Sequence, residues 1–379
     1  MDFNFSDEQR QFRDSLERYL RDDYSFDRRR EIIRSDAGYS PEVWQQLAEM
    51  GALALTLPEA HGGFGGGAFD TVLIMEALGR ANVVEPYLPT VVMGAGLVAL
   101  AGRADQQAEI LPAVAAGECR LSLAHGEPGV RYELESVTTT AIASADSYVL
   151  NGRKSQVLHG GSADRLLISA RTRGGARDAD GVSLFLVDAA TPGLARFAYP
   201  TQDGQRAADL MLKDVQVPRS ALLGVEHEAL PLIEWAVDRA IAALCAEAVG
   251  QMAALIEATV AYLKTRKQFG VPIGSFQALQ HRAVDMYLHA EQARSMAYLA
   301  AARLDAGSAE ERRRAVSAAK VLVGQSARFV GQQAVQLHGG IGVTDELAVS
   351  HYFKRLTMIA LAFGDGDHHL DRFGRLQVA

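Results

Sequence analysis

The sequence has few of the residues that mark several common classes of protein. Two cysteines occur in 379 residues, Cys119 and Cys245, and they are far apart, without a Cys-x-x-Cys or Cys/His spacing. They therefore predict neither a disulfide framework nor a metal site, and we expect both to be small hydrophobic core residues. Basic residues are scattered and the formal net charge is −8, so nothing predicts binding to DNA or RNA.

Long hydrophobic runs are also lacking. The most apolar stretch, near residues 88–101, is interrupted by Pro89, Gly94 and Gly96 and falls short of a membrane span. The first residues hold no basic segment followed by an apolar one, which a signal peptide requires. We therefore expect a cytoplasmic protein that does not interact with a membrane.

What is present is typical of a large globular protein with several domains. Hydrophobic residues make up 48% and charged residues 22% of the chain, which is too apolar for disorder. Helical patterns, starting at the capping box Ser6-Asp7-Glu8-Gln9, fill residues 1–120. Short β-rich runs with turn signals such as Asn151-Gly152 fill residues 121–230, and long helical segments fill residues 231–379. The pattern predicts an α+β protein: a helical domain, an antiparallel β domain and a helical bundle.

Three further motifs have structural explanations. The glycine run at residues 61–67 lacks the Lys-Ser/Thr of a phosphate-binding loop and follows no strand, so we expect a tight loop between helices. His368 and His369 are adjacent and would point to different faces of a helix, and no other ligands are spaced to join them, so we expect no metal. The charge run at residues 310–314 predicts a solvated helix start.

Two C-terminal stretches suit an anionic ligand. Arg266-Lys267-Gln268-Phe269-Gly270 ends one predicted helix with a cation, an aromatic ring and a glycine. Gln336-Leu337-His338-Gly339-Gly340-Ile341-Gly342 ends another with glycines that let a ligand approach backbone N–H groups. A guanidinium and bare amides are what a pyrophosphate needs. Each stretch is equally typical of a helix C-cap.

These stretches, with Phe5-Ser6-Asp7-Glu8-Gln9, Pro58-Glu59-x-x-Gly62-Gly63 and Glu127-Pro128-Gly129, resemble the acyl-CoA dehydrogenase family in order and spacing over essentially the whole chain. Within the family, the chain looks like the small subunits of bacterial two-subunit enzymes, of the pimeloyl-CoA dehydrogenase small-subunit type. The resemblance implies the family fold, with a C-terminal four-helix bundle, and a homo- or hetero-tetramer built as a dimer of dimers. It also implies that FAD lies on one subunit's β domain while a neighbour holds its pyrophosphate and adenosine. The positions that match the neighbour's contribution are Arg266, Phe269, Gln336, Gly339 and Gly340.

The family's reaction follows from the same resemblance. A glutamate removes the α-proton of an acyl-CoA thioester, the β-hydrogen leaves as hydride to the flavin, and trans-2-enoyl-CoA results. An electron-transfer flavoprotein is the implied acceptor, and fatty acid β-oxidation is the implied setting.

The catalytic base departs from the family pattern. The glutamate, normally followed by Gly-Thr or Gly-Ser, falls in Phe363-Gly364-Asp365-Gly366-Asp367. Matching the glycine puts Asp365 at the base position, with Gly366 and Asp367 as cofactor-binding residues beside it, whereas counting from Arg355 puts Gly364 there. We prefer Asp365. An aspartate is one methylene shorter than the family's glutamate, and a displacement of about 1 Å can cost on the order of 100-fold in rate. A polar loop or a helix cap is the competing explanation for both aspartates.

The flavin-facing residues depart as well. The Trp-Ile-Thr/Ser segment that covers the flavin ring in the family aligns with Gln156-Val157-Leu158, and Leu158 cannot give a hydroxyl to the flavin. The usual Ala-Gly-Ser-Asp is replaced by Val130-Arg131-Tyr132-Glu133. An arginine usual three residues after the aspartate that matches Asp238 is replaced by Ile241.

Three hypotheses follow. The chain is a working acyl-CoA dehydrogenase with Asp365 as base, alone or in a mixed oligomer. Alternatively, it is a non-catalytic partner that completes the FAD site of a glutamate-bearing large subunit. A third hypothesis is a flavoenzyme similar to nitroalkane oxidases, which use an aspartate base. No motif indicates the acyl chain of the substrate.

Overall fold

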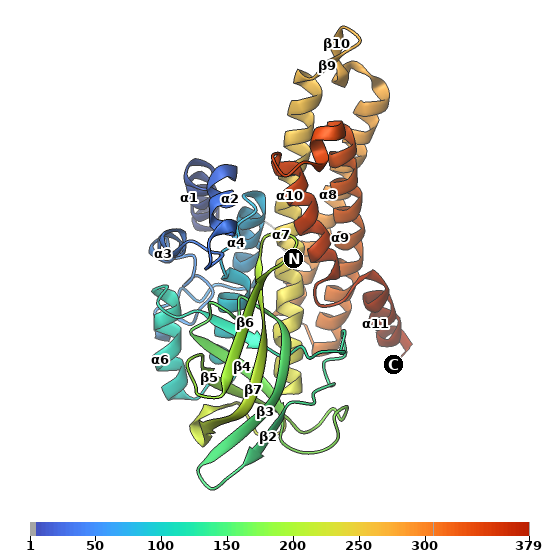
Figure 1. Ribbon diagram of the computed structural model, residues 1–379. Helices are drawn as coiled ribbons and strands as arrows, with labels where there is room; N and C mark the ends of the chain where they lie inside the picture. Colours follow the sequence, from blue (N-terminus) through green and yellow to red (C-terminus); the bar gives the residue numbers. More distant parts are fainter. Residues whose placement is uncertain (1–4, 306, 379) are drawn as a thin grey trace.

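The computed structural model describes residues 5–305 and 307–378, and they form a helical part, a sheet and a second helical part in chain order (Figure 1). This confirms the α+β organisation predicted from the sequence. The N-terminal helices are α1 (Asp7–Asp23), α2 (Phe26–Arg34), α3 (Pro41–Glu49), α4 (Ala68–Arg80), α5 (Gly96–Ala101) and α6 (Ala104–Ala115), with a 3₁₀ turn η1 (Glu59–His61) and a π-helical segment η2 (Leu88–Ala95).

Local sequence signals begin two of the N-terminal helices. Ser6 Oγ accepts a hydrogen bond of 3.2 Å from Gln9 N, and Gln9 Oε1 accepts one of 2.9 Å from Ser6 N, which closes the capping box of α1. Pro41 is the first residue of α3, where its missing N–H costs nothing. The glycine run forms the loop between η1 and α4, as expected.

The middle part is an eight-stranded sheet with the order β6-β7-β3-β2-β4-β5-β8, in which β1 also pairs with β4. The strands are β1 (Leu121–Ala124), β2 (Thr140–Ala143), β3 (Ser147–Leu158), β4 (Arg165–Arg171), β5 (Val182–Asp188), β6 (Leu194–Pro200), β7 (Arg206–Pro218) and β8 (Leu222–Leu223). A 3₁₀ turn, η3 (Arg219–Ala221), connects β7 to β8. The sheet is antiparallel except that β1, and one residue pair of β2, run parallel to β4. Strand β1 enters directly from α6, and the 40 residues that separate it from β4 allow the crossover that parallel pairing needs.

The C-terminal part packs long helices side by side. They are α7 (Leu230–Thr265), α8 (Gln277–Leu304), α9 (Ala309–His338), α10 (Ala348–Leu361) and α11 (Gly366–Val378), with short elements β9 (Lys267–Gln268), β10 (Val271–Pro272), η4 (Ile273–Ser275) and η5 (Gly339–Val343). Helix α7 is long and apolar enough to cross a membrane, but 78% of its most apolar window is buried inside the protein. It is therefore explained as the core helix of the fold, and Cys245 is one of its fully buried residues.

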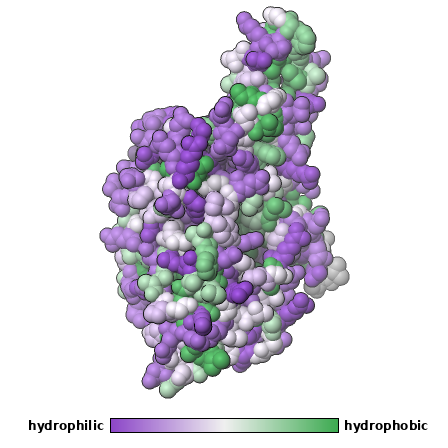
Figure 2. Space-filling view, viewed as in Figure 1, coloured by the Kyte–Doolittle hydropathy of each residue, from purple (hydrophilic) through white to green (hydrophobic). Residues whose placement is uncertain are grey.

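The hairpin of α7 and α8 extends beyond the rest of the molecule, with β9 and β10 at its end (Figure 1). Apolar residues are exposed there, and Figure 2 shows hydrophobic surface at this end. Phe269 is 91% exposed, Val271 40% and Phe276 39%. A projecting end with bare aromatic rings is typical of a contact with another molecule.

A buried ionic network joins the three parts of the chain. Arg355 of α10 binds both carboxylate oxygens of Glu247 on α7, at 2.6 and 2.8 Å, and Asp203 of the β6–β7 loop at 2.9 Å. Arg29 of α2 donates to the carbonyl of Asp203 at 2.8 Å and contacts His351 Nδ1 at 3.0 Å. These contacts fix α10, and with it the segment that follows α10, against both other parts.

Candidate functional site

The structure divides the predicted site residues into two groups. Arg266, Phe269, Gln336, Gly339 and Gly340 lie at the ends of α7 and α9, before α10 begins. The second group, at residues 365–367, follows the end of α10. Helix α10 has 14 residues and is therefore about 21 Å long. The two groups therefore lie at opposite ends of α10, separated along the chain by its length.

The first group forms one surface at the projecting end of the bundle. The rings of Tyr262 and His338 stack with centroids 4.5 Å apart, which joins the ends of α7 and α9. Gly339 has φ 64° and ψ −146°, a conformation essentially restricted to glycine. A Cβ at Gly339 or Gly340 would meet nothing within 4 Å, so the backbone there is open to a ligand.

The charges of this surface suit a pyrophosphate. The side chain of Arg266 is exposed and makes no hydrogen bond or ion pair with another described residue. Phe269 presents its ring to solvent beside it, as noted above. A free guanidinium next to an accessible glycine backbone fits a phosphate group, and an exposed ring fits an adenine. The residues present therefore fit one half of an FAD site.

The second group starts in a tightly held loop after α10. Lys320 of α9 donates to the carbonyls of Ile359 and Ala362 at 2.5 and 2.7 Å, and its burial lowers the pKa of this lysine to about 8. His369 contacts Ser317 Oγ at 3.2 Å through Nδ1 and the carbonyl of Phe363 at 3.1 Å through Nε2. The two buried side chains fix the loop from both sides.

Gly364 has no room for a side chain. Its φ is 119°, and a Cβ would lie 2.5 Å from His369 Nε2 and 2.6 Å from His368 Cδ2. Backbone strain and this overlap both exclude a glutamate in the present loop conformation. If the base position of the family falls on Gly364, this chain has no base.

Asp365 caps α11. Its Oδ1 accepts a hydrogen bond of 3.0 Å from His368 N, and its carbonyl accepts one of 3.1 Å from His369 N. Its Oδ2 lies 3.6 Å from Arg131 Nη2 and 3.5 Å from the Tyr132 hydroxyl. The backbone hydrogen bond from His368, with a smaller contribution from Arg131, holds the pKa of Asp365 below its ordinary value. A lower pKa makes this carboxylate a weaker base.

Gly366 and Asp367 begin α11. Gly366 has open space where a Cβ would be, and Asp367 is exposed in the first turn. An acidic residue in the first turn favours the helix through its dipole, so both residues have a structural role. Among the described residues, neither residue makes a hydrogen bond or ion pair with the first group.

The loop that replaces Ala-Gly-Ser-Asp packs on the start of α11. The rings of Tyr132 and His368 lie 5.0 Å apart, and the guanidinium carbon of Arg131 lies 5.2 Å from the Tyr132 ring centroid. The loop starts at Glu127, which forms a fully buried ion pair of 2.7 Å with Lys154. Three large side chains thus occupy the space beside Asp365.

The other residues that depart from the family's flavin-facing pattern also have defined places in the structure. Leu158 packs against the hydrophobic core and offers no hydroxyl. Strand β3 has a register shift against β7 between Lys154 and Val157, and Gln156 within it has φ 55°. Ile241 is fully buried in the core.

Two arginines that bind Asp238 could not be identified from the sequence. Asp238, fully buried, binds Arg312 Nε at 2.9 Å and Arg372 Nη2 at 2.8 Å. Arg312 belongs to the charge run that we expected to be solvated, so that prediction was wrong for this residue. The partners are 74 and 134 residues away from Asp238, and no local pattern could have paired them.

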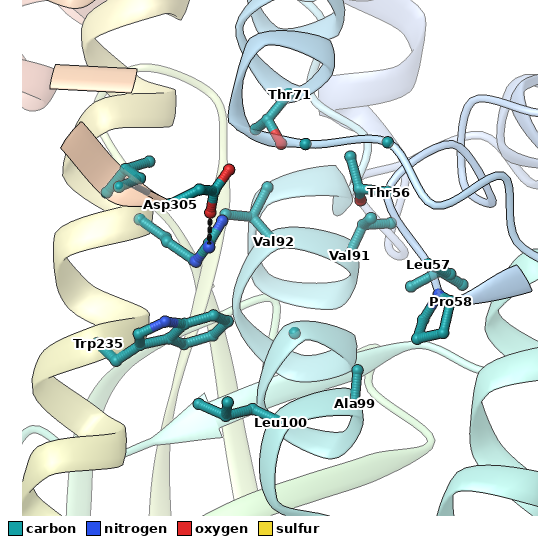
Figure 3. Close-up of a pocket in the computed structure, with 15 residues that line it drawn as sticks. Thr56, Leu57, Pro58, Thr71, Val91, Val92, Ala99, Leu100, Trp235 and Asp305 are labelled. Atoms are coloured by element: carbon teal, nitrogen blue, oxygen red, sulfur yellow. Dashed lines mark hydrogen bonds and ion pairs between the residues drawn. The ribbon is translucent and has the colours of Figure 1, made fainter. Parts of the chain in front are cut away.

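A pocket of about 400 Å³ lies between the two helical parts (Figure 3). It is separate from both groups of predicted site residues. Within residues 5–305 and 307–378, no three His, Cys, Asp or Glu side chains come together as a metal site would need.

Comparisons with known proteins agree with this architecture. Family models described as the N-terminal, middle and C-terminal domains of acyl-CoA dehydrogenase match residues 6–118, 122–215 and 230–376. The chain is 32% identical to a solved structure of a Tcur3481-Tcur3483 steroid ACAD variant, with a TM-score of 0.88 and 98% of both chains covered.

Two further solved structures are similar over the whole chain. One is the ChsE4-ChsE5 complex from Mycobacterium tuberculosis, at 27% identity and a TM-score of 0.89, with 100% of this chain and 99% of that chain covered. The other is an FAD complex of PigA, at 27% identity and a TM-score of 0.91, with the same coverage.

Proposed function

Because this chain belongs to the acyl-CoA dehydrogenase family, whose members are FAD-dependent oxidoreductases that act on CH–CH bonds, we propose that it is the partner subunit of a mixed acyl-CoA dehydrogenase. In this assembly it completes the FAD site of a neighbouring, glutamate-bearing chain. The reaction is the α,β-dehydrogenation of an acyl-CoA thioester to a trans-2-enoyl-CoA, and the neighbour supplies the base.

The state of the base loop carries the proposal. A base must reach the α-carbon of the thioester with a pKa suited to proton abstraction. Gly364 cannot bear a side chain in this loop, and the carboxylate of Asp365 is engaged as a helix cap with a lowered pKa. Neither candidate position therefore supplies an effective base.

The half-site offered to a neighbour supports the same conclusion. The Arg266 side chain has no partner among the described residues, Phe269 is 91% exposed, and Gly339 and Gly340 leave their backbone open. An exposed aromatic ring at such a surface is typical of a contact with a ligand or another chain. The residues that would serve the chain's own flavin, by contrast, are replaced or packed over.

Each residue has a physical task in the assembled site. FAD, when bound, supplies the hydride acceptor. Arg266 would neutralise charge on the pyrophosphate, the glycines would donate backbone N–H groups to it, and Phe269 would exclude water from the adenosine. The solved complex of ChsE4 with ChsE5 shows that a similar chain can occur in a two-component assembly.

The remaining expectations belong to this proposal. We infer a cytoplasmic tetramer, built as a dimer of dimers, that passes electrons to an electron-transfer flavoprotein. We also infer, from the resemblance found in the sequence, that the chain is of the small-subunit type.

The test uses a complex of this chain with a co-expressed, glutamate-bearing acyl-CoA dehydrogenase chain. Arg266→Ala should weaken FAD binding by about 10- to 100-fold, as expected for one charged hydrogen bond. The matched control is Lys264→Ala, an exposed cation at the end of the same helix, and it should leave FAD binding unchanged. An unchanged affinity in Arg266→Ala would contradict the proposed half-site.

A self-sufficient enzyme with Asp365 as base is the second candidate. The observation in its favour is that the Asp365 side chain is 28% exposed, so one oxygen remains accessible. In that case Asp365→Asn should abolish bleaching of the flavin by acyl-CoA while FAD stays bound. If the chain is a partner subunit, the same substitution leaves bleaching of the mixed complex unchanged.

A further inference from the structure

The pocket in Figure 3 lies on a face of α7 that the proposed FAD half-site does not use. Asp238 and Arg239 are neighbours on α7 but point in different directions. Asp238 binds Arg372 of α11, close to the base loop, whereas Arg239 lines the pocket. Residues of η2, α5 and the start of α4 form the other walls of the pocket.

One end of the pocket is apolar. Its wall is the ring of Trp235, and Figure 3 shows Leu100 beside this ring. A Cβ at Gly96 would lie 3.2 Å from the Trp235 ring, so the glycine leaves room for the indole against α5. The π-helical segment η2 supplies Val91 and Val92, and π-helical turns are frequent at functional sites.

The other end is polar, and its two charged side chains pair with each other. Thr56 and Thr71 line it, and neither hydroxyl makes a hydrogen bond to another described residue. Figure 3 shows Thr71 across the pocket from Trp235. Arg239 is neutralised by an ion pair with Asp305 and lies 4.3 Å from the Trp235 ring centroid.

These features select the kind of ligand that the pocket can hold. Arg239 and Asp305 together carry no net charge, so a charged group in the pocket would have no full counter-charge, and burying it is costly. Arg239 Nε is buried without a hydrogen-bond partner among the described residues. An uncharged oxygen, by contrast, can pair with the hydroxyls of Thr56 and Thr71. A volume of about 400 Å³ is within the range of small-molecule sites, roughly 300–1,000 Å³.

We propose that this pocket binds an uncharged, largely hydrocarbon molecule with one hydroxyl or keto oxygen. The hydrocarbon lies against Trp235 and Leu100, and the oxygen pairs with Thr71 and Thr56. The glycine run gains a role, because Gly66 and Gly67 line the pocket and keep its rim free of side chains. The site does not depend on the FAD half-site or on a partner subunit.

The binding test uses the fluorescence of Trp235 in the full-length chain. Titration with 1-adamantanol should give a saturable change, and Trp235→Phe should remove that change, although Trp44 remains. Adamantane-1-carboxylate, which has the same cage and a negative charge, should bind at least about 10-fold more weakly. A response that does not saturate, or equal binding of the two compounds, would overturn the proposal.

Substitutions then locate the site. Ala99→Phe should fill the pocket and abolish saturable binding, whereas Ala108→Phe, on an exposed face of α6, should not. Thr71→Val should weaken 1-adamantanol binding by about 2- to 10-fold, as expected for one hydrogen bond. Thr71→Val changes little volume, so it gives a result even if Ala99→Phe fails to fold. Unaltered binding in Thr71→Val and in a folded Ala99→Phe would place the compound elsewhere and refute the proposal.

Discussion

The carboxylate of Asp365 and the backbone N–H of His368 are joined by a hydrogen bond of 3.0 Å, and this bond makes the candidate base a helix cap. Aspartate and asparagine cap helices about equally well, while alanine does not. We therefore expect Asp365→Asn to change the free energy of unfolding by less than about 0.5 kcal/mol and Asp365→Ala to lower it by about 1 kcal/mol. Urea denaturation followed by circular dichroism measures both. Equal losses in the two variants would show that the cap contributes nothing.

Gly364 and Gly366 form a matched pair of glycines in the base loop. Gly364→Ala should lower the free energy of unfolding by more than about 2 kcal/mol, because a φ of 119° is strained for alanine and its Cβ would overlap His369. Gly366→Ala should be within about 0.5 kcal/mol of the parent protein or more stable, since nothing lies within 4 Å of its Cβ. Thermal unfolding of both variants tests this, and a tolerated Gly364→Ala would mean that the loop readily moves.

The buried ion pair of Arg355 with Glu247 should contribute far more to the free energy of unfolding than an exposed ion pair of the same helix. Glu247→Gln removes the negative charge that faces the buried guanidinium of Arg355 and should lower the free energy of unfolding by about 3–5 kcal/mol. Lys354→Met removes the exposed contact of 3.0 Å with Asp345 and should cost about 0–1 kcal/mol. The difference between the two unfolding midpoints is the measurement, and similar small shifts would contradict the account of the network as a clamp on α10.

Acid should destabilise the protein through two buried histidines. Burial lowers the pKa of His159 to about 4 and that of His369 to about 3. The unfolded chain takes up these protons first, so their stabilising effect is complete above about pH 6.5 and is lost as the pH falls toward 3–4. Burial raises the pKa of Glu85 to about 7. The stability that its bound proton provides is present at low pH and is lost as the pH rises from about 4.5 to 7. The pH dependence due to Glu85 is therefore opposite in sign to that of the histidines.

Single substitutions separate these contributions. Between pH 6 and 5, His369→Asn should make the pH dependence of the unfolding free energy shallower by about 1.4 kcal/mol per pH unit. Glu85→Gln should make it steeper in the same range. Urea denaturation at several pH values measures both, and an identical slope in His369→Asn and the parent protein would contradict a buried neutral histidine.

Much of the fold could be predicted because its signals are local. The capping box at Ser6 begins α1, and the long helical segments predicted over residues 231–379 are present as α7, α8 and α9. Their apolar spacing is sufficient to identify a bundle. The parallel pairing of β1 with β4 could not be predicted, since it depends on contacts between residues 44 positions apart.

The site was less predictable because its residues are defined by distant contacts. The sequence indicated Asp365 by position alone, and the cap to His368 appears only when α11 is in place. The pairing of Asp238 with Arg312 and Arg372 joins three helices. The overlap at Gly364 depends on the orientation of His369, which Ser317 on α9 sets. Arg266 and Gly339 each end a helix with a recognisable sequence, so their place in the fold could be predicted, and their role toward FAD stays a prediction.

The central claim is that this chain completes a neighbour's flavin site and has none of its own. Its most direct test is the amount of FAD bound per protomer, measured by absorbance after purification of the chain alone and in complex with a glutamate-bearing chain. The account predicts almost no FAD on the chain alone and one FAD per two protomers in the complex, bleached by acyl-CoA. Nearly one FAD per protomer on the chain alone, bleached by acyl-CoA, would contradict it.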